Sequence, residues 1–440
     1  MKKIILGLVL LFSCVIFAQN TISGTFKPAK DYSWLIAYRL KPGTQVYVAD
    51  TAINNGAFTL NMPANSPAGT YRLVYAVPQE EFYFDVLYNG KENVELSFTT
   101  DNGVAFISSK ENILFTSYFK ELNDLERRII TYYTSGNTNV REYNAIFKNV
   151  KAVQTNYEIK TKGLIAGKFI KGNQPYIPSG YETIQDYISN KKKNYFNGLN
   201  FTNTTLQASG FLTDKVVNYV FTALPLETIS QEATEKEMQN NVRKVDYYTQ
   251  TVSKGYKLHL YYNLWSQAAA SKLNNLSDFI YTDYLKVLAV EEGKQDIIDA
   301  IELHNRLRIW AIAPDISWGE KGEEKTLSTL EGSTNYVLVF WSSTCSHCLK
   351  ELPALHKELK KHPNIKVVAV GIEDAAMNWK IEIAKFPIFE HALALGKWQG
   401  KYAKLYAINQ TPSYFILDKD KRFIAKPEDD KAVIEFLINN

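Results

Sequence analysis

Hydrophobic positions change their spacing along the chain, and these changes separate regions with different predicted secondary structure. Up to about residue 108, short runs alternate apolar and polar side chains or are rich in aromatic and β-branched residues, which is typical of β-strands. Turn sequences such as Asn54-Asn55-Gly56 and Pro67-Ala68-Gly69 lie between them. The expected strands are 21–26, 45–48, 57–62, 71–75 and 94–98. Several short strands at this spacing favour an all-β sandwich.

From Lys110 to about Trp310 the apolar residues recur at spacings of three and four, which is the period of an amphipathic helix. Loop-rich stretches at 171–180 and 196–210 interrupt this pattern. We therefore expect a mostly α-helical middle domain. The positions that predict its helix faces are Phe115, Tyr118, Phe119, Leu122, Leu125, Val216, Tyr219, Val220, Leu273, Leu276, Ile280, Tyr284, Val287, Ile297, Ile298 and Ile301.

Strands and helices alternate in the last region, which Ala313-Pro314-Asp315 opens. The alternation implies an α/β sheet with helices on both sides, and an antiparallel hairpin formed by the last two strands. The pattern predicts strands at 336–340, 365–370, 413–417 and 423–425, and helices at 345–361, 375–386 and 396–407.

The length of 440 residues is too great for a single core and suggests about three domains. We divide the chain into a β-sandwich domain at 19–109, a helical domain at 110–308 and a last domain at 309–440, after a leader at 1–18. The net charge of +4 is small and no basic block is present, so the sequence does not indicate nucleic-acid binding.

The leader has the pattern of a secretory signal peptide, with Lys2-Lys3, an apolar run from Ile4 to Phe17, and Ala18 before the expected cut. We expect export to the periplasm or the outer face of the cell envelope. A lipoprotein acylated on Cys14 is an alternative, although the apolar run continues past that cysteine.

The remaining cysteines, Cys345 and Cys348, stand where the 336–340 strand turns into a predicted helix. The unpaired N–H groups and dipole of a helix N-terminus favour an anion, so Cys345 should have a lowered pKa and act as the attacking thiolate. Cys348 can then close a disulfide with it. Half of a zinc site and a purely structural disulfide are the alternatives, but the histidines are scattered and no other cysteine pair exists. We expect no metal and no cofactor beyond this redox-active pair.

The last region resembles the thioredoxin superfamily, and within it the exported TlpA-like and ResA-like thiol-disulfide oxidoreductases. Phe340-Trp341 followed by Cys345-Ser346-His347-Cys348 is similar to the family's active-site strand and turn. Pro353 and the segment 409–418, which contains Pro412, also match. The long interval before Pro412 fits the helix and strand that this branch inserts. The resemblance implies a thioredoxin fold for the last domain.

The resemblance also implies roles for single residues. Pro412 would follow a cis peptide bond, leaving the backbone of Thr411 to hydrogen-bond a substrate strand beside the sulfurs, and Trp341 would assist in substrate binding. Glu351 matches an acidic residue typical of this branch and would exchange a proton with Cys348, provided that burial raises its pKa. A plain turn proline and a solvated helix charge are the alternatives for Pro412 and Glu351.

His347 lies between the cysteines, where it would tune the reduction potential upward, unless it is an exposed turn residue with little effect. Thr344 stands where many relatives have tryptophan, and the family's buried aspartate has no evident counterpart. The resemblance implies a disulfide reductase acting on protein disulfides or thiols, with an upstream membrane thiol donor. A dithiol oxidase or isomerase, and a binding or assembly module with a vestigial pair, remain alternatives. The oligomeric state stays open.

The two upstream regions are similar to the composite region found ahead of such domains in exported bacterial proteins. Segments 56–60, 68–72 and 109–112 carry this looser resemblance. It implies architecture but no activity.

Overall fold

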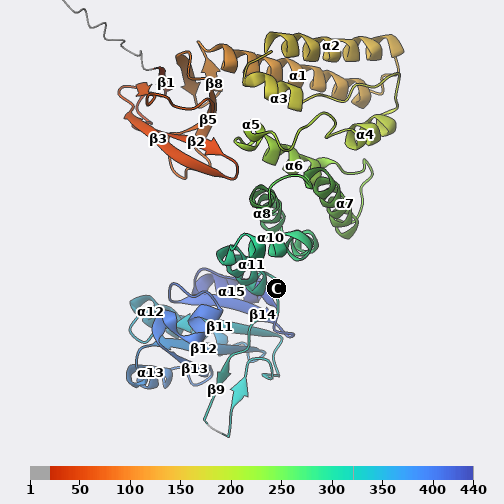
Figure 1. The fold of residues 1–440 in the computed structure, drawn as a ribbon. Helices are drawn as coiled ribbons and strands as arrows, with labels where there is room; N and C mark the ends of the chain where they lie inside the picture. The colour runs from red at the N-terminus through yellow and green to blue at the C-terminus, as the bar shows by residue number, and fades with distance from the viewer. Residues whose placement is uncertain (1–19, 321, 440) are drawn as a thin grey trace, which may run out of the picture. The chain divides into compact units, whose positions relative to one another are not determined.

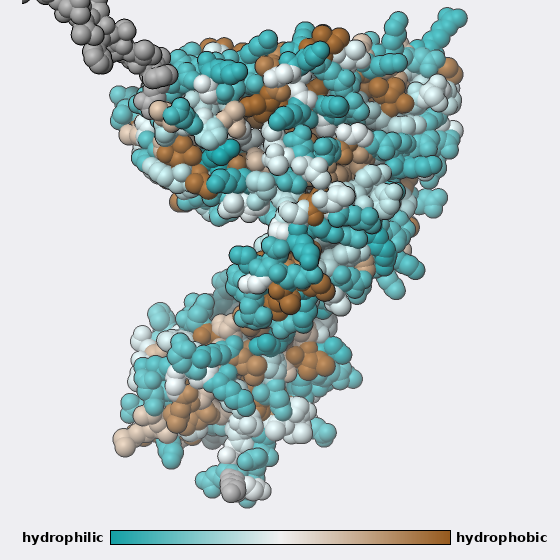
Figure 2. Space-filling model, viewed as in Figure 1, coloured by the Kyte–Doolittle hydropathy of each residue, from teal (hydrophilic) through white to brown (hydrophobic). Residues whose placement is uncertain are grey.

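The computed structural model describes residues 20–320 and 322–439, so the predicted signal peptide and Cys14 lie outside the described residues. The chain divides into two compact units, one ending at Gly293 and the other beginning at Lys294 (Figure 1). Within the described ranges, no helix combines the length and apolar character needed to cross a membrane. Most of the surface in view is hydrophilic, and the apolar side chains on it form small separate groups (Figure 2).

The first unit begins with a β-sandwich, which confirms the prediction for this region. Its two four-stranded sheets have the orders β4-β1-β7-β8 and β3-β2-β5-β6. β1 and β7 pair in parallel, whereas the other pairs are antiparallel. Apolar residues from both sheets enter one core, as Phe58 and Leu60 do while Thr59 between them is exposed. The strands are β1 (Thr21–Lys27), β2 (Trp34–Lys41), β3 (Thr44–Ala52), β4 (Ala57–Asn61), β5 (Gly69–Val74), β6 (Tyr83–Tyr88), β7 (Val94–Thr99) and β8 (Gly103–Phe106).

The rest of the first unit is helical, as predicted. The longest helices, α1 and α2, share a core of tyrosine, isoleucine and phenylalanine side chains and lie side by side (Figure 1). One π-helical turn, η1 (Tyr281–Leu285), joins α9 to α10. The helices are α1 (Lys110–Thr134), α2 (Val140–Lys160), α3 (Ala166–Gly172), α4 (Ile184–Lys193), α5 (Thr204–Gln207), α6 (Phe211–Thr222), α7 (Gln231–Thr249), α8 (Lys254–Ala270), α9 (Asn274–Ile280) and α10 (Lys286–Glu291).

A short segment, Ser109–Asn112, connects the sandwich to the helices, and its residues other than Lys110 are buried. The Ser109 hydroxyl accepts a hydrogen bond from the Asn112 N–H and so caps α1. The Asn112 side chain accepts from the Leu87 N–H at 2.8 Å and donates to the Leu87 carbonyl at 2.7 Å, as a neighbouring strand would. The Glu111 carboxylate accepts from the Ala166 N–H at 2.8 Å at the start of α3. The side chains of Ser109, Glu111 and Asn112 therefore each have a hydrogen-bond partner inside the protein.

The second unit is built on a five-stranded sheet with the order β13-β12-β11-β14-β15. β11, β12 and β13 are parallel, while β14 is antiparallel to both β11 and β15. A small antiparallel pair, β9 (Ser317–Trp318) and β10 (Lys325–Thr326), forms a separate two-stranded sheet. The sheet strands are β11 (Asn335–Trp341), β12 (Ile365–Glu373), β13 (Glu390–Leu395), β14 (Ser413–Asp418) and β15 (Phe423–Ala425).

Helices cover both faces of this sheet, as predicted. Val337, Val339 and Trp341 pack in one core with α12, α13 and α15, and the alternating residues of β11 pack in another with α11 and α14. The predicted helix at 396–407 is shorter and divided into η2 and α14. The elements are α11 (Gln295–Leu307), α12 (Ser346–Leu359), α13 (Ala376–Ile383), η2 (Lys397–Gln399), α14 (Lys401–Leu405) and α15 (Asp430–Asn439).

Candidate active site

The two cysteines lie at the first turn of α12, immediately after β11 ends at Trp341. Cys345 is the N-cap residue, and its sulfur accepts a hydrogen bond from the Cys348 N–H at 3.4 Å. Both thiols are free. Cys345 is partly exposed, whereas Cys348 is fully buried in the core between α12 and the sheet. Only the first sulfur is therefore accessible to a large partner.

The two thiols have opposite electrostatic environments. Burial raises the pKa of Cys345, but hydrogen bonds from the Cys348 thiol and N–H, from the Thr411 side chain and from the His347 N–H outweigh it and leave that pKa lowered. Burial, reinforced by the neighbouring Cys345, raises the pKa of Cys348. The direction at Cys345 is the one expected from its place at a helix N-terminus. The site thus pairs a surface thiol that ionises readily with a core thiol that keeps its proton.

The Thr411–Pro412 peptide bond is cis, and the Thr411 carbonyl contacts the Cys345 sulfur. The Cys345 thiol, when protonated, donates to the Thr411 carbonyl at 3.3 Å. β14 begins at Ser413 and pairs antiparallel with β11, with Ser413 opposite Phe340. This register brings a segment that is distant in the sequence to the end of the strand that precedes the cysteines.

Glu351 is half-buried one turn beyond Cys348, and it accepts a hydrogen bond from the Tyr414 hydroxyl at 3.0 Å. Burial raises the pKa of Tyr414, and the neighbouring Glu351 and Cys348 add to the effect. Tyr414 therefore lies within electrostatic reach of both Glu351 and Cys348.

Trp341 and His347 occupy very different places. Trp341 is fully buried, with its ring edge-on to Phe386 at a centroid separation of 6.1 Å. Its side chain therefore supports the end of β11 from within the core and does not face the surface beside Cys345. The His347 side chain is exposed.

Sequence reasoning missed Glu373, which is only 3% exposed at the end of β12. Its carboxylate accepts hydrogen bonds from the Ser343 N–H and, at 3.3 Å, from the Ser342 hydroxyl, so it holds the loop that leads into Cys345. β11 and β12 are parallel with Trp341 opposite Gly371, which puts their carboxyl ends side by side. The sequence does contain a signal for this role, since Glu373 is an acidic residue at the end of the apolar run that forms β12.

Among the residues that the structure describes, no group of three or more histidine, cysteine, aspartate or glutamate side chains is arranged to hold a metal ion. His356 and His391 are largely buried against Phe386 and Phe389, and burial lowers the pKa of both imidazoles. Their contacts are those of packing residues.

Comparison with known proteins identifies the fold of this unit. Residues 333–423 match a family model described as thioredoxin-like, so the second unit carries a thioredoxin-like domain. No curated protein matches the chain.

Solved structures with similarity to the chain come from several bacteria. They include a domain of a possible thiol-disulfide isomerase from Cytophaga hutchinsonii, with 28% identity over 30% of this chain and 92% of that chain, at a TM-score of 0.27. A thiol-disulfide oxidoreductase from Bacteroides fragilis is 25% identical over 29% of this chain and 98% of its own, at a TM-score of 0.26. A thioredoxin-like protein from Bacteroides caccae is 19% identical over 60% of this chain and 97% of its own, at a TM-score of 0.36.

Proposed function

We propose that the chain is an exported thiol-disulfide oxidoreductase that reduces disulfides in protein substrates. The observation that carries this proposal is the asymmetry of the pair: a partly exposed thiol with a lowered pKa caps the helix above a buried thiol with a raised one. A low-pKa, accessible thiolate is the species that attacks a disulfide, and a second thiol within the same turn can displace the product.

In the proposed cycle, the Cys345 thiolate attacks one sulfur of the substrate disulfide and forms a mixed disulfide with it. The substrate S–S bond breaks, and the other substrate sulfur leaves as a thiolate. Cys348 then loses its proton and attacks the Cys345 sulfur of the mixed disulfide. This step forms the Cys345–Cys348 disulfide and releases the second substrate thiol, so two electrons pass to the substrate. An upstream thiol donor in the membrane returns them. Within this chain, the cycle uses the Cys345–Cys348 pair as its redox group.

Cys348 must give up a proton although its pKa is raised, so the second step needs a base. Glu351 is the candidate for this role, since its hydrogen-bond partner Tyr414 lies within electrostatic reach of Cys348. Thr411 and Pro412 form the wall beside Cys345 along which a substrate strand would lie.

Insulin reduction by the full chain, with dithiothreitol as donor, tests the proposal. We expect turnover by the wild type, none by Cys345→Ser, and a trapped mixed disulfide with Cys348→Ser. Equal activity of wild type and Cys345→Ser would refute it and favour a binding role for the chain.

The reduction potential of the pair, measured against a glutathione series, then separates a reductase from an oxidase. A potential near that of DsbA, about −120 mV, would mean that electrons flow from the substrate to the pair.

A further inference from the structure

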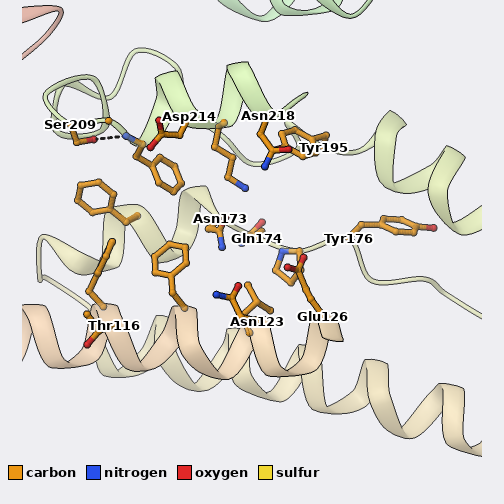
Figure 3. Close-up of a pocket in the computed structure, with 18 of the residues that line it drawn as sticks. Thr116, Asn123, Glu126, Asn173, Gln174, Tyr176, Tyr195, Ser209, Asp214 and Asn218 are labelled. Atoms are coloured by element: carbon orange, nitrogen blue, oxygen red, sulfur yellow. Dashed lines mark hydrogen bonds between the residues drawn. The ribbon is translucent and has the colours of Figure 1, made fainter. Parts of the chain in front are cut away.

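The first unit contains a cavity of about 660 Å³, remote in sequence from the cysteine pair. Side chains of α1, among them Thr116, Asn123 and Glu126, form one wall, and Asp214 and Asn218 of α6 lie opposite (Figure 3). A volume of this size is within the range of ligand pockets, roughly 300–1,000 Å³.

Much of the cavity lining is aromatic. The Phe169 ring stands between those of Phe115 and Phe211, edge-on to both with centroid separations of 5.5 Å, so one row of rings connects α1, α3 and α6. Side-chain amides of Asn123, Asn173 and Gln174 lie along the same space (Figure 3). An apolar surface with a few hydrogen-bonding groups is the usual composition of a small-molecule site.

Among the charged groups that line the cavity, Lys215 and Asp214 have no ion pair within the described part of the chain. Lys191 pairs with Glu126 at 3.4 Å, and Asp85 pairs with Arg72 at 2.9 Å. The Lys215 ammonium has no ion pair and no hydrogen bond within the described part of the chain, and it faces the Tyr195 ring at 5.1 Å.

The electrostatics of Lys215 agree with this geometry. Burial lowers the pKa of Lys215 to about 8, with Glu126 opposing the shift and Lys191 adding to it. The adjacent Asp214 is not among the charges that act on Lys215. Burial and Asp85 raise the pKa of the Asp214 carboxyl, and Arg72 opposes them. Two lysines therefore share one carboxylate at this end of the cavity.

We propose that this cavity binds a small organic acid with an aromatic or aliphatic body. Its single anionic group lies beside Lys215 and Lys191, and its apolar body packs against the row of rings formed by Phe115, Phe169 and Phe211. An anion in this place supplies the missing partner of a half-buried ammonium, which is costly to leave unpaired. The proposal concerns the first unit alone and does not depend on the redox chemistry of the second.

Two fluorescent dyes of similar shape test the proposal on the full chain. The anionic probe is 8-anilinonaphthalene-1-sulfonate, and N-phenyl-1-naphthylamine is its neutral counterpart. We expect one sulfonate dye per wild-type chain, and a loss of affinity of about tenfold or more in Lys215→Met, because a charged hydrogen bond is removed. The neutral dye should bind both proteins equally. Lys215→Arg should restore binding of the sulfonate, and Lys120→Met, at an exposed position of α1, should bind like the wild type.

A second variant checks the location. Asn218→Trp places a large ring in the cavity from an exposed helix position, so both dyes should lose their site while the midpoint of thermal unfolding stays unchanged. Unchanged sulfonate affinity in Lys215→Met, an equal loss of both dyes in that variant, or unchanged binding of both in Asn218→Trp would each overturn the proposal.

Discussion

At the scale of single residues, two chemically identical side chains differ because of where the backbone places them. Cys345 caps a helix at the surface, and Cys348, within the same first turn, is enclosed by the core. Hydrogen bonds to the first sulfur favour its anion, while removal of the second from water favours its neutral form. This contrast is the physical basis of the proposed division of labour between them.

The contrast predicts that the reduced protein has one fast-reacting thiol. The rate of alkylation by iodoacetamide should rise with pH, with a midpoint below the ~8.5 of a free thiol, because only the thiolate reacts and its folded-state pKa is lowered. Cys348→Ala should move the midpoint upward, since it removes the thiol that hydrogen-bonds Cys345. Cys345→Ser is the control and should show no fast labelling. Two thiols labelled at equal rates would contradict this account.

Glu373 gives a second prediction at this scale. In Glu373→Gln, an amide N–H₂ replaces one of the carboxylate oxygens that accept hydrogen bonds from the Ser342 hydroxyl and the Ser343 N–H. The free energy of unfolding of the second unit should therefore fall by about 1–3 kcal/mol. The Ser342–Ser343 loop should also shift, which would alter the alkylation midpoint of Cys345. Asp374→Asn, at the neighbouring exposed position, is the matched control and should leave that midpoint unchanged. If both variants behave like the wild type, Glu373 does not hold the loop.

The sequence predicted roles for the cysteines, Thr411, Pro412 and Glu351 because each lies in a short recognisable segment. It could not identify Glu373, whose contact with Ser343 depends on the pairing of β11 with β12. The sequence also predicted that Trp341 helps to bind the substrate, whereas the structure buries its side chain. Proximity to Cys345 along the chain does not reveal which face of a strand a side chain occupies.

At the scale of elements, α12 holds the site by its buried face. Leu352, Leu355 and Leu359 enter the core, while Pro353 within the helix is exposed. Leu352→Ala should reduce the free energy of unfolding of the second unit by about 2–5 kcal/mol, because it leaves a cavity under the cysteines. Leu349→Ala, at a position that is 39% exposed, is the control and should change it by less than about 0.5 kcal/mol. Denaturant titration followed by tryptophan fluorescence measures both, and equal effects would contradict the packing described.

Elements with a single clear period were predicted well, and those with mixed signals were not. Strands 413–417 and 423–425 were found because their residues are aromatic and β-branched and a turn separates them. The local sequence pattern did not predict β13. The residues of this strand suit a helix equally well, since they are Glu390-His391-Ala392-Leu393-Ala394-Leu395. Pairing with β12 makes this segment a strand, and a local sequence pattern contains no information about such a tertiary contact.

At the scale of the whole molecule, the chain contains two units with separate cores. The sequence grouped α11 with the helical middle, because its apolar spacing is helical, whereas the structure places Leu303 and Leu307 against the sheet of the second unit. Which core a helix joins depends on packing partners that its own period does not specify.

The junction at Asn112 should therefore affect the stability of one unit only. Asn112→Asp removes the donor to the Leu87 carbonyl and leaves that buried group unpaired, so the unfolding transition of the first unit should lose about 1–3 kcal/mol while that of the second stays unchanged. Asn156→Asp on the exposed side of α2 is the control. Scanning calorimetry resolves the transitions, and a shift of both by the same amount would show that the units unfold together.

The sulfur that caps α12 is also the atom proposed to exchange partners. Once Cys345 is joined to another sulfur, it no longer carries a negative charge for the Cys348 N–H to point at. The hydrogen bond from the Cys348 N–H would therefore be weaker in the oxidised protein, and the first turn of α12 would be less stable. The stability of this turn would then differ between the two oxidation states, and a partner bound at that surface would contact a different backbone in each.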